Sequence, residues 1–363
     1  MMFYCLSEPE YETSNWYKHI VNGLLHAKRS KRFTVMLTES VEEIEKFNVN
    51  TDDILLVIGT NSKWLDYVID KFEKLFENRI IVLGNCERRY AKKYSVVTFD
   101  VSRDVKLLYN YLKYYKKEHI AMYGINPHSA SDGFRKKSFL DSGAFVEDVY
   151  TNNGDMKKCF ENFKAKSDCY DGIICANDYC AISLVKCLKE NNIPVPFIVS
   201  CGETKLAREF VPSITNLKTN YSSFGEIGVQ LAKLLNKNSN INSIECRLTS
   251  EILPGQTTEC LPISFDNESI YVVDNESEDN FYADSEVDEM IKIEKLLNAC
   301  DKTDRNLLQC ILDGVPYSEI AEKLYMSTNS IKYKLKGMYD ICSVNSKAEF
   351  MELINKYINS NIQ

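Results

Sequence analysis

The sequence predicts an α/β protein with two lobes, followed by a small all-α unit. Short apolar runs, many of them β-branched, alternate with helical stretches throughout residues 1–263, which is typical of doubly wound parallel sheets. The runs are too many for one sheet of ordinary size, so we expect two sheets and two lobes. Beyond residue 290 the apolar residues follow helical spacing instead.

The elements of the α/β part follow from these runs. Strands are expected at 3–6, 33–38, 54–59, 80–83, 96–99, 119–123, 145–150, 172–176, 197–200 and 213–217. Helices are expected at 16–28, 63–77, 104–115, 132–141, 156–166, 178–191 and 224–235. No GxGxxG follows a strand and no GxxxxGK[ST] occurs, so a nucleotide-binding enzyme has little support.

Cysteine usage and hydropathy restrict the class of protein. There are 13 cysteines and four histidines but no CxxC pair, so we expect no metal site and no cofactor. Cys175, Cys180 and Cys187 lie in apolar runs and are predicted to be reduced core thiols of a cytoplasmic protein. No run approaches 18 apolar residues, and the N-terminus lacks a signal peptide pattern.

The negative charge is concentrated in one segment. The chain carries a net charge of −8, and residues 264–290 contain ten Asp and Glu but no Lys or Arg. One-sign charge and low apolar content predict an extended linker, with a short strand at 270–273. Residues 287–297 are amphipathic, and they form either a dimer helix or the first helix of the C-terminal unit's own core.

Three helices are predicted in the C-terminal unit, at 304–313, 317–324 and 328–341, and Ser327 is suited to cap the third. The spacing gives this third helix an inward stripe of Ile331, Leu335, Met338, Tyr339 and Cys342. Its outward stripe is Asn329, Lys332, Tyr333 and Lys336, with Lys334 on the flank and Thr328 at the start. Two lysines, an amide and a phenol can reach the phosphates and base edges of double-stranded DNA.

This unit resembles the LuxR-type helix-turn-helix domain, over roughly the last sixth of the chain. The match includes EIAEKL (319–324), STNSIK (327–332) and YDICSV (339–344). The resemblance implies DNA binding, with Lys332 at the DNA backbone. The sequence departs from that family at Tyr325, where a glycine is usual, and in the lead-in to the first helix. The alternative is a small helical bundle used for protein contacts.

Three upstream stretches, 129–143, 172–196 and 211–235, resemble the effector-binding domain of the lac repressor family. The resemblance spans most of 1–263 and is clearest over 119–256. It implies a type I periplasmic-binding-protein fold, with a ligand held between two lobes. The chain is then expected to cross between the lobes near 100–101, 218–220 and 249–253.

The same resemblance implies Arg135 and Asn177 as ligand contacts. Arg135 offers a fixed fork of donors, and Asn177 can both donate and accept. Asp178 is interpreted as the N-cap of its helix rather than as a ligand contact.

The sequence departs from the lac repressor family where carboxylates are expected. Gly202 stands at the position of an expected Asp, with Glu203 as its substitute, and Gly84–Asn85 stands at a second acidic position. Aromatic walls are expected from Trp16 and Phe134, whereas Trp64 is interpreted as a core or surface residue.

The predicted organisation is a ligand-binding domain (1–263), an acidic linker (264–290) and a DNA-binding domain (291–363). We expect a ligand-responsive transcription regulator rather than an enzyme, acting as a homodimer without membrane contact. Its effector would be a sugar or a related polar metabolite. The alternative is a solute-binding or dimerisation protein whose cleft takes no diffusible ligand. A phosphorylation-driven response regulator is disfavoured, because Asp52–Asp53 precedes a strand instead of following one.

Overall fold

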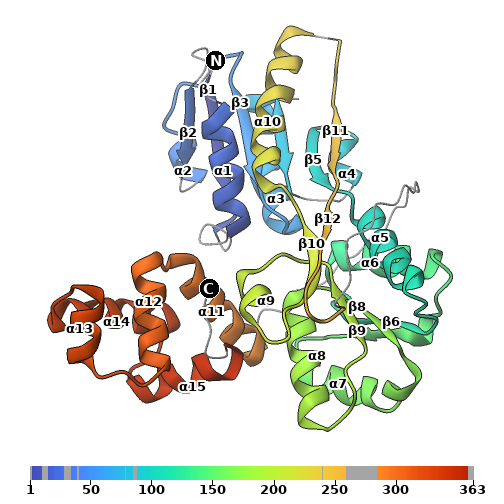
Figure 1. Cartoon of the computed structure of the whole chain (residues 1–363). Coiled ribbons are helices and arrows are strands. Elements are labelled where there is room, and N and C mark those ends of the chain that lie inside the picture. The colour runs from blue at the N-terminus through green and yellow to red at the C-terminus, as the bar shows by residue number, and fades with distance from the viewer. Residues whose placement is uncertain are drawn as a thin grey trace. The chain divides into compact units, whose positions relative to one another are not determined.

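The computed structural model describes residues 2–9, 15–27, 34–38, 41–77, 79–84, 88–238, 240–258 and 284–358 (Figure 1). Most of the predicted acidic linker, including the expected strand at 270–273, lies outside these residues, as does Asn85. Within the described part of the chain, no helix is long and apolar enough to span a bilayer.

The described chain divides into two compact units. The first, lobe 1, consists of residues up to 104 and residues 219–250. The second contains lobe 2, made of 105–218 and 251–258, together with the helical region 284–358. The chain therefore passes between units at 104–105, 218–219 and 250–251, close to the three predicted crossovers.

Lobe 1 is built on a sheet of six parallel strands in the order β11-β5-β4-β3-β1-β2. The strands are β1 (Met2–Ser7), β2 (Thr34–Thr38), β3 (Ile54–Ile58), β4 (Ile80–Leu83), β5 (Ser95–Phe99) and β11 (Glu245–Leu248). The helices are α1 (Asn15–Ala27), α2 (Val41–Ile44), α3 (Ser62–Phe76), α4 (Arg88–Ala91) and α10 (Tyr221–Lys237).

Lobe 2 repeats this architecture, with the strand order β12-β10-β9-β8-β6-β7 and only β12 antiparallel to its neighbour. The strands are β6 (Ile120–Ile125), β7 (Val149–Thr151), β8 (Gly172–Cys175), β9 (Phe197–Ser200), β10 (Thr215–Lys218) and β12 (Glu251–Leu253). The helices are α5 (Val101–Tyr114), α6 (Ala130–Asp141), α7 (Met156–Lys164), α8 (Asp178–Glu190) and α9 (Lys205–Glu209).

The predicted α/β class with two mainly parallel sheets is confirmed. One predicted strand is corrected, and one observed strand was not predicted. The strand expected at 145–150 is a short 3₁₀ helix followed by β7, because Phe145 and Val146 are 65% and 63% exposed and cannot serve as a buried strand. β11 was not expected, since Glu245 and Arg247 interrupt any apolar run, and it pairs only at the edge of its sheet.

Buried cysteines are part of these cores. Cys175 and Cys180 are fully buried, and Cys187 is partly buried against the same cluster. Burial raises the pKa of the Cys159 thiol in this core to about 12, which keeps it protonated and unreactive. Cys175 and Cys180 are therefore core residues, as predicted.

Two glycines let α1 and α10 pack at close range in lobe 1. A Cβ built on Gly225 would lie 2.1 Å from the carbonyl oxygen of Ile20. A Cβ on Gly23 would lie 1.9 Å from the carbonyl oxygen of Ser222. Contact of backbone with backbone leaves no room for a side chain, so this crossing requires glycine.

The three crossovers leave lobe 1 from one hydrogen-bonded cluster. The Asp104 carboxylate accepts from the hydroxyl (2.9 Å) and the backbone N–H (3.3 Å) of Ser250. The Ser250 hydroxyl also lies 2.7 Å from that of Thr219. All three residues are buried, so the ends of the three connections are fixed to one another within lobe 1.

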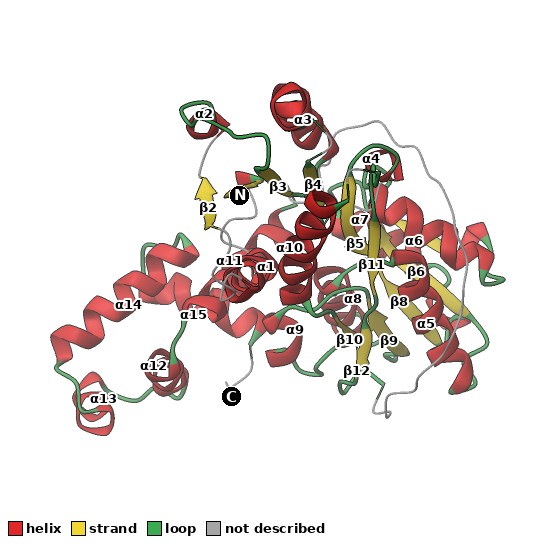
Figure 2. Cartoon of the chain, turned by 90° about the horizontal axis from the view of Figure 1, so that it is seen from above, coloured by secondary structure: helices red, strands yellow, loops and turns green. Residues whose placement is uncertain are grey.

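The helical region consists of five helices among the described residues (Figure 2). They are α11 (Ser285–Ala299), α12 (Lys302–Leu312), α13 (Tyr317–Leu324), α14 (Thr328–Cys342) and α15 (Lys347–Tyr357). Asp301 caps α12 through a reciprocal capping box, and the hydroxyl of Ser327 caps α14. These local signals place the helix starts within two residues of the predicted positions.

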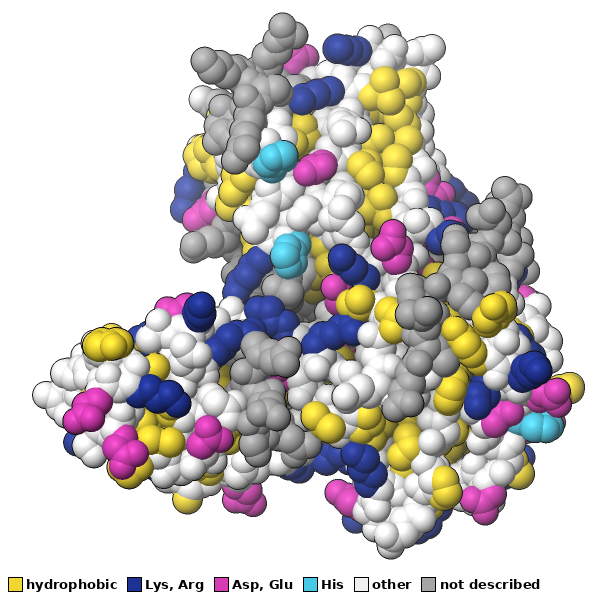
Figure 3. Space-filling view, viewed as in Figure 1, with side chains coloured by type: hydrophobic (Ala, Val, Ile, Leu, Met, Phe, Trp, Pro, Cys, Tyr) yellow, Lys and Arg dark blue, Asp and Glu magenta, His cyan; other side chains and the backbone are white. Residues whose placement is uncertain are grey.

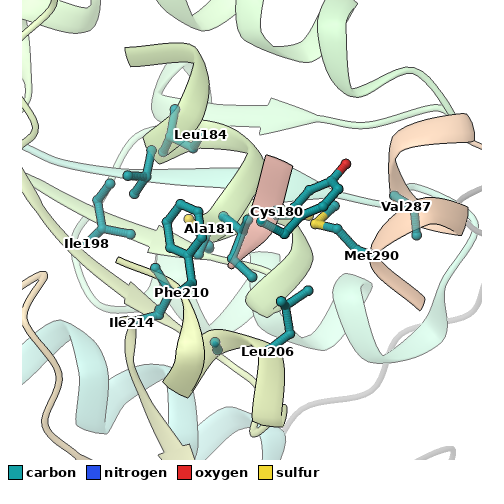
Figure 4. Packing of buried hydrophobic residues seen from close by; sticks show 14 of the residues in the cluster. Cys180, Ala181, Leu184, Ile198, Leu206, Phe210, Ile214, Val287 and Met290 are labelled. Atoms are coloured by element: carbon teal, nitrogen blue, oxygen red, sulfur yellow. The ribbon is translucent and has the colours of Figure 1, made fainter. Parts of the chain in front are cut away.

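Lobe 2 and the helical region share one apolar core. Val287 and Met290 of α11 lie against the part of the core formed by α8 and α9, including Leu206 (Figure 4). The same cluster continues through Ile293 into α14, where Leu335 is 2% exposed. Burial of about 25 cal/mol per Å² of apolar surface favours this arrangement over a separate, tethered helical unit.

A buried carboxylate fixes α11 to α9. The backbone N–H groups of Lys205 and Leu206, at the start of α9, donate to Glu294 at 3.2 and 2.8 Å. Asn298 donates to the same carboxylate at 2.9 Å. Burial raises the pKa of Glu294 and outweighs the opposite effect of these hydrogen bonds. α11 therefore supplies the acceptor that the first turn of α9 needs.

The packing of α11 decides between the two interpretations of 287–297. Its apolar face is buried against its own chain, so this is a helix of the molecule's own core, and the alternative of a dimer helix is not supported. Polar contacts reinforce the docking, with Glu286 bound to Ser183 (2.8 Å) and Lys186 (3.1 Å) of α8. Residues 285–290, expected in the extended linker, form the first turns of α11.

We predict that Gly225→Ala lowers the free energy of unfolding by about 1–3 kcal/mol, because the added methyl would overlap backbone of α1. The matched control is Gly337→Ala in α14, where a Cβ meets no atom within 4 Å. That change should stabilise by roughly 0.5–1 kcal/mol through helix propensity. Urea denaturation monitored by circular dichroism measures both, and equal effects of the two variants would contradict the close crossing.

We predict that Glu294→Ala destabilises the second unit by about 1–3 kcal/mol, because two backbone N–H groups of α9 lose their acceptor. Hydrogen exchange at the amides of Lys205 and Leu206 should accelerate. Glu322→Ala, at an exposed position of α13, is the control and should change stability by less than about 0.5 kcal/mol. Unchanged exchange at these two amides would show that Glu294 does not hold α9.

Candidate functional sites

The topology indicates where each lobe can hold a ligand. In each sheet the first strand, β1 or β6, lies next to the edge strand, with the second strand on one side and the third on the other. The order in which strands are added to the sheet reverses at this point. The crevice beyond the carboxyl ends of the two adjacent strands is the usual ligand position in such sheets. These positions are the ends of β1 and β3 in lobe 1, and of β6 and β8 in lobe 2.

Arg135 is held near the end of β6. It lies in the second turn of α6, and its guanidinium pairs with Asp132 and lies 3.4 Å from the Ser131 hydroxyl. Asp132 in turn accepts from the backbone N–H of Asn126, which follows β6, at 2.8 Å. The predicted ligand residue is therefore oriented by a carboxylate that the sequence did not single out, and its side chain keeps 19% exposure.

Asn177 lies two residues beyond the end of β8 and is half-buried. Its side-chain oxygen accepts from the backbone N–H of Cys180 at 3.0 Å, which makes Asn177 the N-cap of α8. The side-chain NH₂ group is then the part suited to a ligand. The prediction that Asp178 caps this helix is wrong, because the residue before it takes that role.

Asp178 instead joins four elements of lobe 2. It is 1% exposed and accepts from the Ser200 hydroxyl at the end of β9. It also accepts from the backbone N–H (2.6 Å) and hydroxyl (3.0 Å) of Thr204, the N-cap of α9. The amide of Asn216 in β10 donates to it at 3.2 Å. A buried carboxylate is stable here because donors surround it.

This network explains the missing acidic residue at 202. A Cβ on Gly202 would lie 3.1 Å from the carboxyl carbon of Asp178 and 3.2 Å from its backbone nitrogen. An aspartate at 202 would therefore crowd a second carboxylate against the first. Glu203, the expected substitute, is half-buried in the loop between β9 and the N-cap Thr204.

The predicted aromatic walls differ in accessibility. Phe134 of α6 is 5% exposed, so little of its ring can meet a ligand. Trp16 of α1 is partly buried in lobe 1, where its ring lies 3.5 Å from a Cβ built on Gly84 at the end of β4. The Trp64 ring packs close to Gly59 at the end of β3, in agreement with its interpretation as a packing residue.

Lobe 1 contributes a carboxylate that was not among the predicted contacts. Glu8 follows β1 and is 3% exposed. It accepts from the backbone N–H groups of Thr60 (3.0 Å) and Asn61 (3.1 Å), just beyond β3. It therefore connects the two strand ends at the switch point of lobe 1. The position of Glu8 just after a predicted strand is a signal from which this carboxylate could have been found. The family resemblance did not include it.

The outward stripe of α14 is open to solvent. Thr328, Asn329, Lys332 and Lys336 are exposed, and Tyr333 is 80% exposed. In the part of the chain that the structure describes, no carboxylate lies within 4.0 Å of either lysine. Figure 3 views the helical region from the side of α12 and α13, where Lys and Arg, acidic and exposed hydrophobic side chains are interspersed.

Lys334 differs from the other lysines of α14. Its ammonium lies 2.6 Å from Asp304 and 3.9 Å from Asp301 at the start of α12. The hydrogen bond with Asp304 raises the pKa of Lys334. This lysine therefore joins two helices, beside a groove of about 400 Å³ between α11, α12 and α14.

Comparisons with known proteins bear on the α/β part. No family model matches the chain, and no curated relative does. A LacI family transcriptional regulator, CcpA, from Weissella paramesenteroides with bound sucrose is a structural neighbour, with a TM-score of 0.55 and 16% identity. The match covers 70% of this chain and 98% of that one.

Two further structures are similar to the same extent. CcpA of Lactococcus lactis has a TM-score of 0.57 at 14% identity, covering 71% of this chain and all of that one. The lac repressor dimer, bound to operator and the anti-inducer ONPF, has a TM-score of 0.55 at 12% identity, with coverage of 71% and 93%. The chain thus has the type I periplasmic-binding-protein-like fold that forms the effector-binding domain of these transcription regulators.

Proposed function

We propose that this protein is a ligand-responsive, DNA-binding transcription regulator. One observation carries the proposal: an exposed helix face with lysine, amide and phenol groups belongs to the same packed unit as lobe 2, which has the fold of regulator effector domains. A ligand on the lobe and DNA on the helix can therefore influence one another through a continuous core.

The proposed DNA-contacting surface is Thr328, Asn329, Lys332, Tyr333 and Lys336 of α14. In this proposal α13 and α14 form the LuxR-type helix-turn-helix, and α14 enters the major groove. Lys332 and Lys336 neutralise phosphates, while Asn329 reads a base edge. Lys334 is left out because its charge is paired with α12. Two copies would present two such helices to adjacent half-sites.

The proposed effector is a sugar or a related polar metabolite. Arg135 and Asn177 offer donors and Glu203 an acceptor in lobe 2. Trp16 in lobe 1 offers a flat apolar surface, which suits the faces of sugar rings. The sucrose in one structural neighbour supports this class of ligand.

The contacts within the second unit suggest how the signal travels. Asn177 and Glu203 flank the Asp178 network, which holds Thr204 at the start of α9. The next two residues of α9 bind Glu294 of α11, and α11 packs against α14. Movement of the 201–204 loop on ligand binding would therefore shift the docking of α11 and the angle of the proposed recognition helix.

We expect Lys332→Ala to weaken binding to a mixed-sequence duplex of about 30 base pairs, and to reduce the slope of log affinity against log salt by about one. Fluorescence anisotropy over a series of salt concentrations measures this. Lys157→Ala, an exposed lysine of α7, is the matched control and should leave the slope unchanged. If the two variants behave alike, α14 is not the DNA-binding face.

A thermal-shift screen against mono- and disaccharides, nucleosides and amino acids should yield a stabilising ligand. At a concentration of 100 Kd the expected gain is about 2.7 kcal/mol. Arg135→Ala should abolish that shift and leave DNA binding at wild-type strength, whereas Arg89→Ala, on α4, should retain both. A screen without any hit would favour the alternative that the protein has no diffusible ligand.

A further inference from the structure

Tyr325 lies in the turn between α13 and α14, and both its backbone conformation and its exposure are unusual. Its backbone is left-handed, with φ 54° and ψ 44°, and its side chain is 97% exposed. The turn itself is closed by backbone hydrogen bonds, from Met326 N–H to Ala321 (2.9 Å) and from Tyr325 N–H to Glu322 (3.4 Å). The tyrosine side chain takes no part in closing it.

Folding alone does not favour tyrosine at this position. A left-handed conformation costs a residue with a Cβ about 1–2 kcal/mol, and glycine avoids most of this cost. A ring that is 97% exposed gains almost nothing from packing in return. Residues held in such conformations without a structural gain are candidates for contact with a partner.

The surroundings of Tyr325 indicate which partner. Among the described residues, Tyr325 and Tyr333 are the two most exposed large hydrophobic side chains, at 97% and 80%. Tyr325 precedes Thr328, the first residue of α14, by three positions, so their Cα atoms are at most about 11 Å apart. The tyrosine therefore lies beside the N-terminal turn of the proposed recognition helix, whose face also carries Lys332.

We propose that Tyr325 contacts DNA, with its phenol O–H donating to a backbone phosphate beside the groove that α14 enters. Phenols are frequent donors to phosphate oxygens, and such contacts fix the orientation of a reading helix. The inference rests on the proposed DNA-binding function and adds a residue at the turn to its surface. The phenol is neutral, so this contact releases no counterion and differs in kind from that of Lys332.

The test compares Tyr325→Phe, Tyr325→Gly and Ser343→Gly in the full chain, on the mixed-sequence duplex of about 30 base pairs. Ser343 ends α14 in the same left-handed conformation, φ 55° and ψ 41°, and is the matched control for backbone strain. Tyr325→Phe keeps the ring and the strain but removes the hydroxyl. We expect it to weaken binding about tenfold, as for loss of a hydrogen bond to a charged group, with an unchanged salt slope.

The two glycine variants separate strain from contact. Both should raise the thermal midpoint of unfolding, but only Tyr325→Gly should also weaken DNA binding. Wild-type affinity in both Tyr325 variants would overturn the inference while leaving the proposed function intact. Absence of binding by the wild-type chain at low salt would overturn the proposed function, and this inference with it. A reduced salt slope in Tyr325→Phe would also contradict a neutral phenol contact.

Discussion

The burial of α11 is the constraint on which the second unit depends. Its apolar face fills the space between α8, α9 and the helical region, and its Glu294 supplies the acceptor for the first turn of α9. Without this helix, the first turn of α9 would lose its acceptor. The C-terminal helices would keep smaller contacts with lobe 2, such as the 3.2 Å ion pair between Arg305 and Glu209 and the contact of Lys186 with the Tyr357 ring. The orientation of the C-terminal helices relative to lobe 2 is thus set by packing. A close-packed interface of this kind is hard to compress and transmits strain from one side to the other.

Buried carboxylates in both lobes hold the loops at the ends of neighbouring strands. Asp178 and Glu8 are buried and accept from backbone or hydroxyl donors, so they hold the loops that follow neighbouring strands. Those loops are also where ligands bind in this kind of sheet. In the proposed effector site, loops held this way are ordered without a ligand, which would limit the entropy lost on binding.

In the helical region, by contrast, several polar and aromatic side chains are exposed to solvent. Lys332, Lys336, Tyr333 and Tyr325 contribute little to packing, whereas Lys334, on the same helix, is committed to Asp304. Helical spacing placed Lys334 on the flank of the outward stripe but did not show that its charge is paired. The position of α12 shows that Lys334 stabilises the region, whereas Lys332 and Lys336 stay exposed.

The sequence by itself determined the elements whose signals are local. Ser327 precedes α14, helical spacing defines the buried stripe from Ile331 to Cys342, and apolar runs mark most of the strands, because capping and periodicity depend on residues only a few positions apart. Tertiary structure alone decided the burial of α11, the role of Asp178 and the close approach of Asp178 to Gly202. Each depends on atoms distant in sequence, such as Glu294 and Leu206, 88 positions apart, and no local pattern records which distant groups will meet.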